Sequence, residues 1–118
     1  MIRPFSMVLA IAFLAVAGHS AAAGFGFMAK GTMSRFSEAD MKLFEDALGK
    51  ALAAETTGVP VEWKNEQTGA SGVITPRRIF RKASGPCSEV RIVNRHKTSA
   101  DRGVYSFCQQ DGRWSLAQ

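Results

Sequence analysis

The chain has 118 residues, which excludes more than one small domain. Its 15 Lys and Arg against 10 Asp and Glu leave a net charge of +5, which favours anionic over cationic partners. It holds only two cysteines and two histidines, and neither His19 nor His96 lies in a metal-ligand pattern, so the sequence predicts no metal site and no cofactor.

The first 23 residues are typical of a secretory signal peptide. Arg3 gives a positive start, residues 7–17 form an apolar run, and residues 21–23 are three alanines suited to cleavage. We expect cleavage near Ala23 and export to the periplasm, with no transmembrane span in the mature chain. The alternative is an uncleaved membrane anchor, because no full charge lies between Arg3 and Lys30 and a span needs about 20 apolar residues.

Residues 24–36 contain three glycines and no steady period, which predicts a flexible lead. An amphipathic helix is predicted over 37–55, where Ser37 is suited to be the N-cap and Asp40 completes a variant of the capping box. Its apolar residues recur at steps of three and four and form one stripe: Met41, Phe44, Leu48, Ala51 and Leu52.

Beyond Gly58 the sequence predicts five short strands, at 59–64, 73–82, 87–96, 104–110 and 113–118. Pro76 cannot donate to a ladder, so we expect its strand to be an edge or to carry a bulge there. Short turns join the strands, which predicts an α+β domain over 37–118: one helix packed on a small antiparallel meander. Trp63 and Trp114 are expected in the packed layer.

Cys87 and Cys108 are predicted to form one disulfide after export. Cys87 opens the third predicted strand and Cys108 lies late in the fourth, and such positions are neighbours in an antiparallel pair. The alternative is a pair of buried free thiols.

The stretch WKNEQTGASGVITP, residues 63–76, is rich in turn formers. Gly69 and Gly72 permit positive φ and Thr68 can hydrogen-bond locally, which favours a structural turn. A ligand-binding loop would use similar residues, although no ionic or aromatic cluster lies within the turn.

Positive charge is concentrated in the predicted sheet, where ten Lys and Arg follow Val59 and only five acids accompany them. Without a bulge, Arg77 and Arg81 share one side of the second strand, and Arg91 and Arg95 share one side of the third. These four arginines are candidates for binding anionic lipid headgroups or lipopolysaccharide. The alternative is a solvated face whose arginines cover apolar neighbours. Nucleic acid is not an expected partner, because export removes the protein from it.

No catalytic residues are predicted. No serine, threonine or cysteine has a histidine and an acid arranged around it by a known motif, and His96 lies in a polar turn. The carboxylates of the sheet half are scattered singly: Glu62, Glu66, Glu89, Asp101 and Asp111. We therefore expect a protein that is not an enzyme, with a small envelope hydrolase as the alternative.

Several motifs follow one another in a fixed order: Trp63, Asn65, Thr68-Gly69, Gly72, Thr75-Pro76, Gly85-Pro86-Cys87, Cys108, Asp111-Gly112 and Trp114. This order resembles the C-terminal domain of the rickettsial seventeen-kilodalton surface antigen family. The resemblance implies a cell-envelope protein of Gram-negative bacteria, often an outer-membrane lipoprotein, with no known enzymatic activity. Envelope proteins are then further expected partners.

Two features of that family are missing from this sequence. The stretch AVAG is followed by His19 rather than by a cysteine that could carry a lipid, and the family's glycine zipper is absent. We therefore expect a soluble or peripherally attached protein of the periplasm or of the outer-membrane periphery.

Overall fold

The computed structural model describes Met28 and residues 31–117, so the predicted signal peptide lies outside the described residues. A 3-10 helix, η2, spans Thr32–Arg35, and an α-helix, α1, spans Glu38–Ala53. Five strands follow: β1 (Val61–Asn65), β2 (Ala70–Lys82), β3 (Gly85–His96), β4 (Ser99–Gln110) and β5 (Arg113–Leu116). This arrangement confirms the predicted α+β fold.

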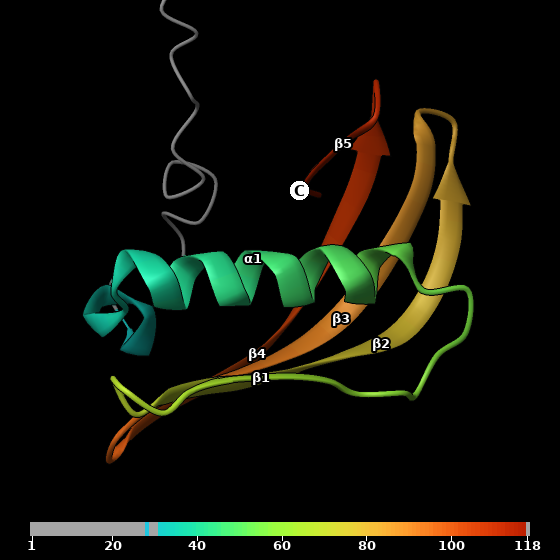
Figure 1. The fold of residues 1–118 in the computed structure, drawn as a ribbon. Coiled ribbons are helices and arrows are strands. Elements are labelled where there is room, and N and C mark those ends of the chain that lie inside the picture. The colour runs from blue at the N-terminus through green and yellow to red at the C-terminus, as the bar shows by residue number, and fades with distance from the viewer. Residues whose placement is uncertain (1–27, 29–30, 118) are drawn as a thin grey trace, which may run out of the picture.

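The five strands form one antiparallel sheet in the order β1-β2-β3-β4-β5, as a meander requires. Figure 1 shows the sheet curving around α1, which lies on its concave side. β2 and β4 begin earlier than predicted, because Ala70 pairs with His96 and His96 pairs with Ser99. Pairing with neighbouring strands outweighs the turn propensity of these small and polar residues.

The predicted N-terminus of α1 is confirmed. The Asp40 N–H donates to Ser37 Oγ at 3.1 Å, and the Ser37 N–H donates to Asp40 Oδ2 at 2.9 Å, which completes the capping box. The helix ends at Ala53, and its apolar stripe faces the sheet. The core residues include Phe44, Leu48, Ala51, Leu52, Trp63, Ile74, Val90, Ile92 and Phe107.

The two tryptophans both pack against this core, as predicted. Trp63 is buried and makes edge-on contacts with the rings of Phe36 and Phe44, at centroid distances of 5.2 and 6.5 Å. Trp114, in β5, is partly buried. Aromatic burial of this kind is a main source of stability in a domain of this size.

The end of the expected flexible lead is in fact packed on the sheet. Thr32 and Met33 of η2 are buried, and the Thr32 N–H donates to the Asp101 carboxylate on β4. Gly31 permits this approach, because a Cβ there would lie 2.0 Å from Asp101 Oδ2. Thr32 and Met33 are therefore packed within the segment that the sequence led us to expect as a flexible lead, and the Asp101 partner of Thr32 lies 69 positions later in the sequence.

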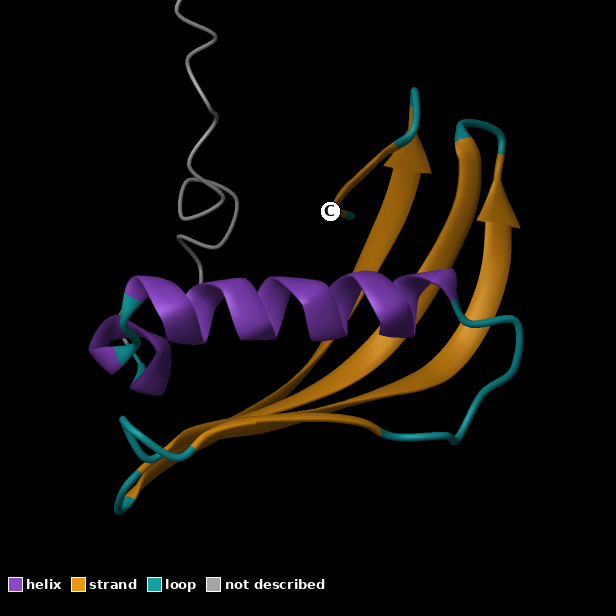
Figure 2. Ribbon diagram, in the orientation of Figure 1, coloured by secondary structure: helices purple, strands orange, loops and turns teal. Residues whose placement is uncertain are grey.

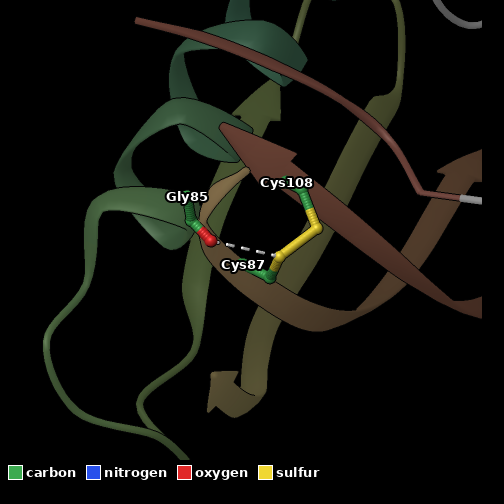
Figure 3. Close-up of a disulfide and its surroundings, with 3 residues drawn as sticks. All are labelled: Gly85, Cys87 and Cys108. Atoms are coloured by element: carbon green, nitrogen blue, oxygen red, sulfur yellow. Dashed lines mark hydrogen bonds between the residues drawn. A yellow bond between two sulfur atoms is a disulfide. The ribbon is translucent and has the colours of Figure 1, made fainter. Parts of the chain in front are cut away.

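Cys87 and Cys108 form the predicted disulfide, which joins directly opposed positions of β3 and β4. Figure 3 shows the bond between the strands, with Cys87 Sγ beside the Gly85 carbonyl oxygen. Cys87 is only 1% exposed. The bond therefore fixes the third and fourth strands to each other from within the packed structure.

Pro76 satisfies both of its predicted conditions. The pairing of β1 with β2 ends at Val61 and Ile74, and a register shift follows between Pro76 and Arg78. The Pro76 carbonyl accepts the Gly58 N–H at 2.8 Å, so this side of β2 faces the loop before β1. Proline is tolerated here because its nitrogen points away from β3.

Candidate functional site

The polar side chains of the β1–β2 turn bind the first turn of α1. Asp40 Oδ1 accepts hydrogen bonds from Asn65 Nδ2 at 2.8 Å and from Thr68 Oγ1 at 2.7 Å. Asn65 Oδ1 in turn accepts the Gln67 N–H, and Thr68 Oγ1 accepts the Ala70 N–H. The asparagine and threonine of the WKNEQTG stretch therefore connect helix to sheet, which favours the structural interpretation of this turn.

Asp40 is fully buried, yet it carries the charge that these donors require. Burial acts to raise the pKa of Asp40, but the hydrogen bonds from Ser37, Thr68 and Asn65 together outweigh it, so the pKa is lowered from 3.8. We name Asp40, Asn65 and Thr68 the aspartate anchor. The sequence indicated Asp40 only as part of a helix cap, because its contacts with the turn are tertiary.

The two glycines of the turn have different roles. Gly69 has the expected positive φ of 75°, but Gly72 lies within β2 and does not. A Cβ on Gly72 would lie 2.2 Å from Trp63 Nε1, directly across the β1–β2 pair. The absence of a side chain, rather than backbone freedom, is therefore what Gly72 contributes.

The bulge separates the four arginines that the sequence grouped as a candidate anion-binding site. Arg91 pairs with Thr75, and Arg95 with Ser71, on the convex face of the sheet. After the bulge, Arg81 pairs with Pro86 and falls on the concave side, while Arg77 is the extra residue of the bulge. The grouping of Arg77 with Arg81 was expected only without a bulge. The bulge is present, so Arg77 and Arg81 do not share a face with Arg91 and Arg95, because one inserted residue reverses the alternation.

Three other cations lie on the convex face with Arg91 and Arg95. Alternation along the paired strands puts Arg78 beside Glu89, Lys64 in the row of Arg95, and Arg102 opposite Val93. We name this set the convex basic face: Lys64, Arg78, Arg91, Arg95 and Arg102. The sequence missed three of its members because the face depends on register.

Only two of the five cations on the convex basic face have an acidic partner among the described residues. Arg78 lies 4.0 Å from Glu89, and Lys64 lies 3.7 Å from Glu66. Arg91, Arg95 and Arg102 are exposed and form no ion pair with any residue that the structure describes. Such a face attracts anions in a salt-dependent way.

A cavity of about 360 Å³ lies beside η2 on the concave side. Met33 and Ile92 give it apolar walls, and Asp101 and Tyr105 line it from β4. Asn94 lines it as well, and its buried Oδ1 accepts no hydrogen bond from the described residues. The Asp101 carboxylate already accepts the Thr32 N–H, so the lining is suited to contact rather than to acid–base chemistry.

The described part of the chain shows no constellation for metal binding, since no three His, Cys, Asp or Glu side chains gather around one point. His96 lies at the end of β3 rather than in a turn, on the concave side opposite Ala70 and Ser99. Neither helix among the described residues is long and apolar enough to cross a bilayer.

The chain is similar to proteins named 17 kDa surface antigen from several Rickettsia species. It is 31% identical over 81 residues to the one from Rickettsia felis, which covers 67% of this chain and 51% of that relative. The proteins of that name from Rickettsia prowazekii and Rickettsia conorii are 30% identical over the same length. The chain thus spans about half the length of the curated relatives it matches.

These similarities confirm the resemblance inferred from the order of the motifs. No family model matches the chain. No solved structure matches it.

Proposed function

We propose that this chain, a surface-antigen-type protein similar to the rickettsial 17 kDa surface antigens, is a non-enzymatic interaction protein of the Gram-negative cell envelope. The observation that carries the proposal is the disulfide between Cys87 and Cys108, because such bonds persist outside the cytosol. The leader over residues 1–23 agrees with export, and the names of the relatives agree with a place at the surface.

The proposed interaction role follows from how the polar residues are used. The aspartate anchor satisfies its own donors and acceptors, and the carboxylates that follow Val59 lie singly on strands and turns. What remains available is surface: the convex basic face and the free edges of the sheet. A rigid scaffold with exposed charge is suited to binding.

Mass spectrometry of the protein from fractionated cells tests the location. The full sequence is expressed in a Gram-negative host, and periplasmic and cytosolic fractions are alkylated with and without reductant. We expect a periplasmic product that lacks residues 1–23 and gains two alkyl groups only after reduction. A cytosolic product that retains Met1 and alkylates without reductant contradicts the proposal.

A second candidate function is binding of an anionic envelope component, either lipid headgroups or lipopolysaccharide. The unpaired Arg91, Arg95 and Arg102 favour it, as does Val104 between them, which is 46% exposed. We expect the protein to bind vesicles containing phosphatidylglycerol, and we expect added salt to weaken this binding.

The bulge provides a matched control for this second function. The change Arg91→Ala with Arg95→Ala should weaken vesicle binding, whereas Arg81→Ala should not, because Arg81 lies on the other side of the sheet. Equal binding by both variants and the parent would remove the convex basic face from consideration.

A further inference from the structure

The distal half of β2 is an open edge of the sheet. β1 pairs with β2 only from Ala70 to Ile74, whereas β3 remains paired with β2 as far as Lys82. The loop before β1 reaches this side of the strand at Pro76, through the Gly58 N–H. Figure 2 shows β2 and β3 extending beyond the end of α1. Residues 77–82, which we name the β2 edge, have no strand beside them in the described part of the chain.

The register shows which main-chain groups face outward from this edge. The Cα atoms of Cys87 and Cys108 are 4.0 Å apart, which marks a non-hydrogen-bonded pair, so the main-chain groups of Cys87 point to β2. Phe80, which pairs with Cys87, therefore directs its own N–H and C=O to β3. By alternation, the N–H and C=O groups of Ile79 and Arg81 point away from the sheet.

The β2 edge is backed by a rigid template. The disulfide holds β3 to β4 at the level of Phe80, so the strand that supports the edge is covalently fixed to its own neighbour. Phe80 is also covered by Arg78, whose guanidinium carbon lies 4.2 Å from the ring centroid. A preformed edge binds an added strand with less loss of conformational freedom than a mobile one does.

The positive charge of the β2 edge favours an acidic partner. Its sequence, RRIFRK, holds four cations and no acid, and Arg77, Arg78, Arg81 and Lys82 are all exposed. Pairing with a second copy of the same edge would bring these cations together and is disfavoured. Ile79 is 42% exposed between them and offers an apolar contact.

We propose that the β2 edge receives an extended, acidic segment of a partner protein, which adds to the sheet as a strand beside Ile79 and Arg81. The main-chain groups of these two residues would hold the segment, while its carboxylates meet Arg77, Arg81 and Lys82. This names a partner class for the interaction role proposed above and rests on that role.

Binding of a model peptide to the purified protein tests the proposal. The probe is an eight-residue peptide in which glutamate alternates with valine, and its affinity is measured by fluorescence anisotropy. We expect saturable binding that weakens as salt is added. A second peptide has the same sequence but is methylated on every main-chain nitrogen, and it should bind at least about tenfold more weakly because it has no main-chain N–H left to pair with the edge.

Two variants of Ile79 form a matched pair. Ile79→Pro removes the outward N–H while sparing the ladder to β3, and should weaken binding by about tenfold or more. Ile79→Ala keeps that N–H and should bind within a few-fold of the parent. If Ile79→Pro does not fold, as judged by circular dichroism, the methylated peptide on the parent protein decides the question.

A variant pair tests the role of charge. Arg81→Glu should weaken peptide binding, whereas Arg113→Glu, in β5 at the opposite edge of the sheet, should have little effect. The proposal is overturned if the parent does not bind the peptide, or if it binds both peptides equally. The cations would then serve to protect the edge against edge-to-edge aggregation. These measurements use purified protein, so they fail independently of the envelope location.

Discussion

The hydroxyl of Thr68 donates to the carboxylate of Asp40 at 2.7 Å, although 28 residues separate them. Through this contact the β1–β2 turn is fixed to the first turn of α1, and the same carboxylate accepts from Asn65 and from the Ser37 N–H. The Asp40 carboxylate accepts hydrogen bonds from both the helix and the turn. The packing of α1 on the sheet therefore depends on this one ionised group.

This dependence predicts a loss of stability in acid. Because the pKa of Asp40 is lowered from 3.8 on folding, its contribution is fully present above that value and is lost as the pH falls through the lowered pKa. Asp40→Asn should reduce the free energy of unfolding at pH 7 by about 2 kcal/mol. It should also flatten the fall in stability below about pH 4.

Urea unfolding between pH 2 and pH 7 measures both effects. Glu38→Gln is the control, because it removes a carboxylate from the same helical turn as Asp40, but one that is exposed to solvent. If the stability of Asp40→Asn fell in acid as steeply as that of the parent, the aspartate anchor would not be the cause of the fall.

Gly72→Ala is predicted to displace the indole of Trp63, because the added Cβ would lie 2.2 Å from Nε1 and 3.0 Å from the Val93 carbonyl oxygen. Overpacking of this kind costs about 1–3 kcal/mol. In a Trp114→Phe background, the fluorescence of Trp63 should shift to longer wavelength.

The matched control is Gly49→Ala, at an exposed helical position where an added Cβ meets nothing within 4 Å. It should stabilise the protein by about 1 kcal/mol through helix propensity. We expect Gly72→Ala to lower the free energy of unfolding and Gly49→Ala to raise it. Equal effects of the two changes would refute the role assigned to Gly72.

Replacing Cys87 and Cys108 together by serine should lower the free energy of unfolding by about 3 kcal/mol, because the unfolded chain regains the freedom of the loop that the bond closes. Denaturant unfolding with and without reductant measures this. Reductant should destabilise the parent and leave the double variant unchanged. A parent that is insensitive to reduction, although its thiols then alkylate, would contradict the prediction.

Asp101→Asn should release η2 from β4 without unfolding the core. The Thr32 N–H would lose a charged acceptor, so its hydrogen exchange should accelerate by at least about tenfold. Amides of β3 should exchange as in the parent. Asp111→Asn, at a turn position with a φ of 52° that asparagine also adopts, is the control and should leave Thr32 protected.

The sequence by itself determined those features that depend on neighbours along the chain. The Ser37 and Asp40 cap, the apolar stripe of α1 and the succession of hairpins all involve contacts over a few residues, and the pattern of residue types specifies them. The pairing of Cys87 with Cys108 was also predictable, because two cysteines on adjacent strands leave one connectivity.

Only the tertiary structure decided which residues share a surface. One extra residue at the bulge after Pro76 turns Arg81 to the concave side. The sequence offered an edge or a bulge at the proline, and only the structure shows which residue is the extra one. The contact of Asp40 with Thr68 and the docking of Thr32 on Asp101 join segments 28 and 69 residues apart. Such contacts depend on how the helix and η2 lie on the curved sheet, and no local pattern encodes that placement.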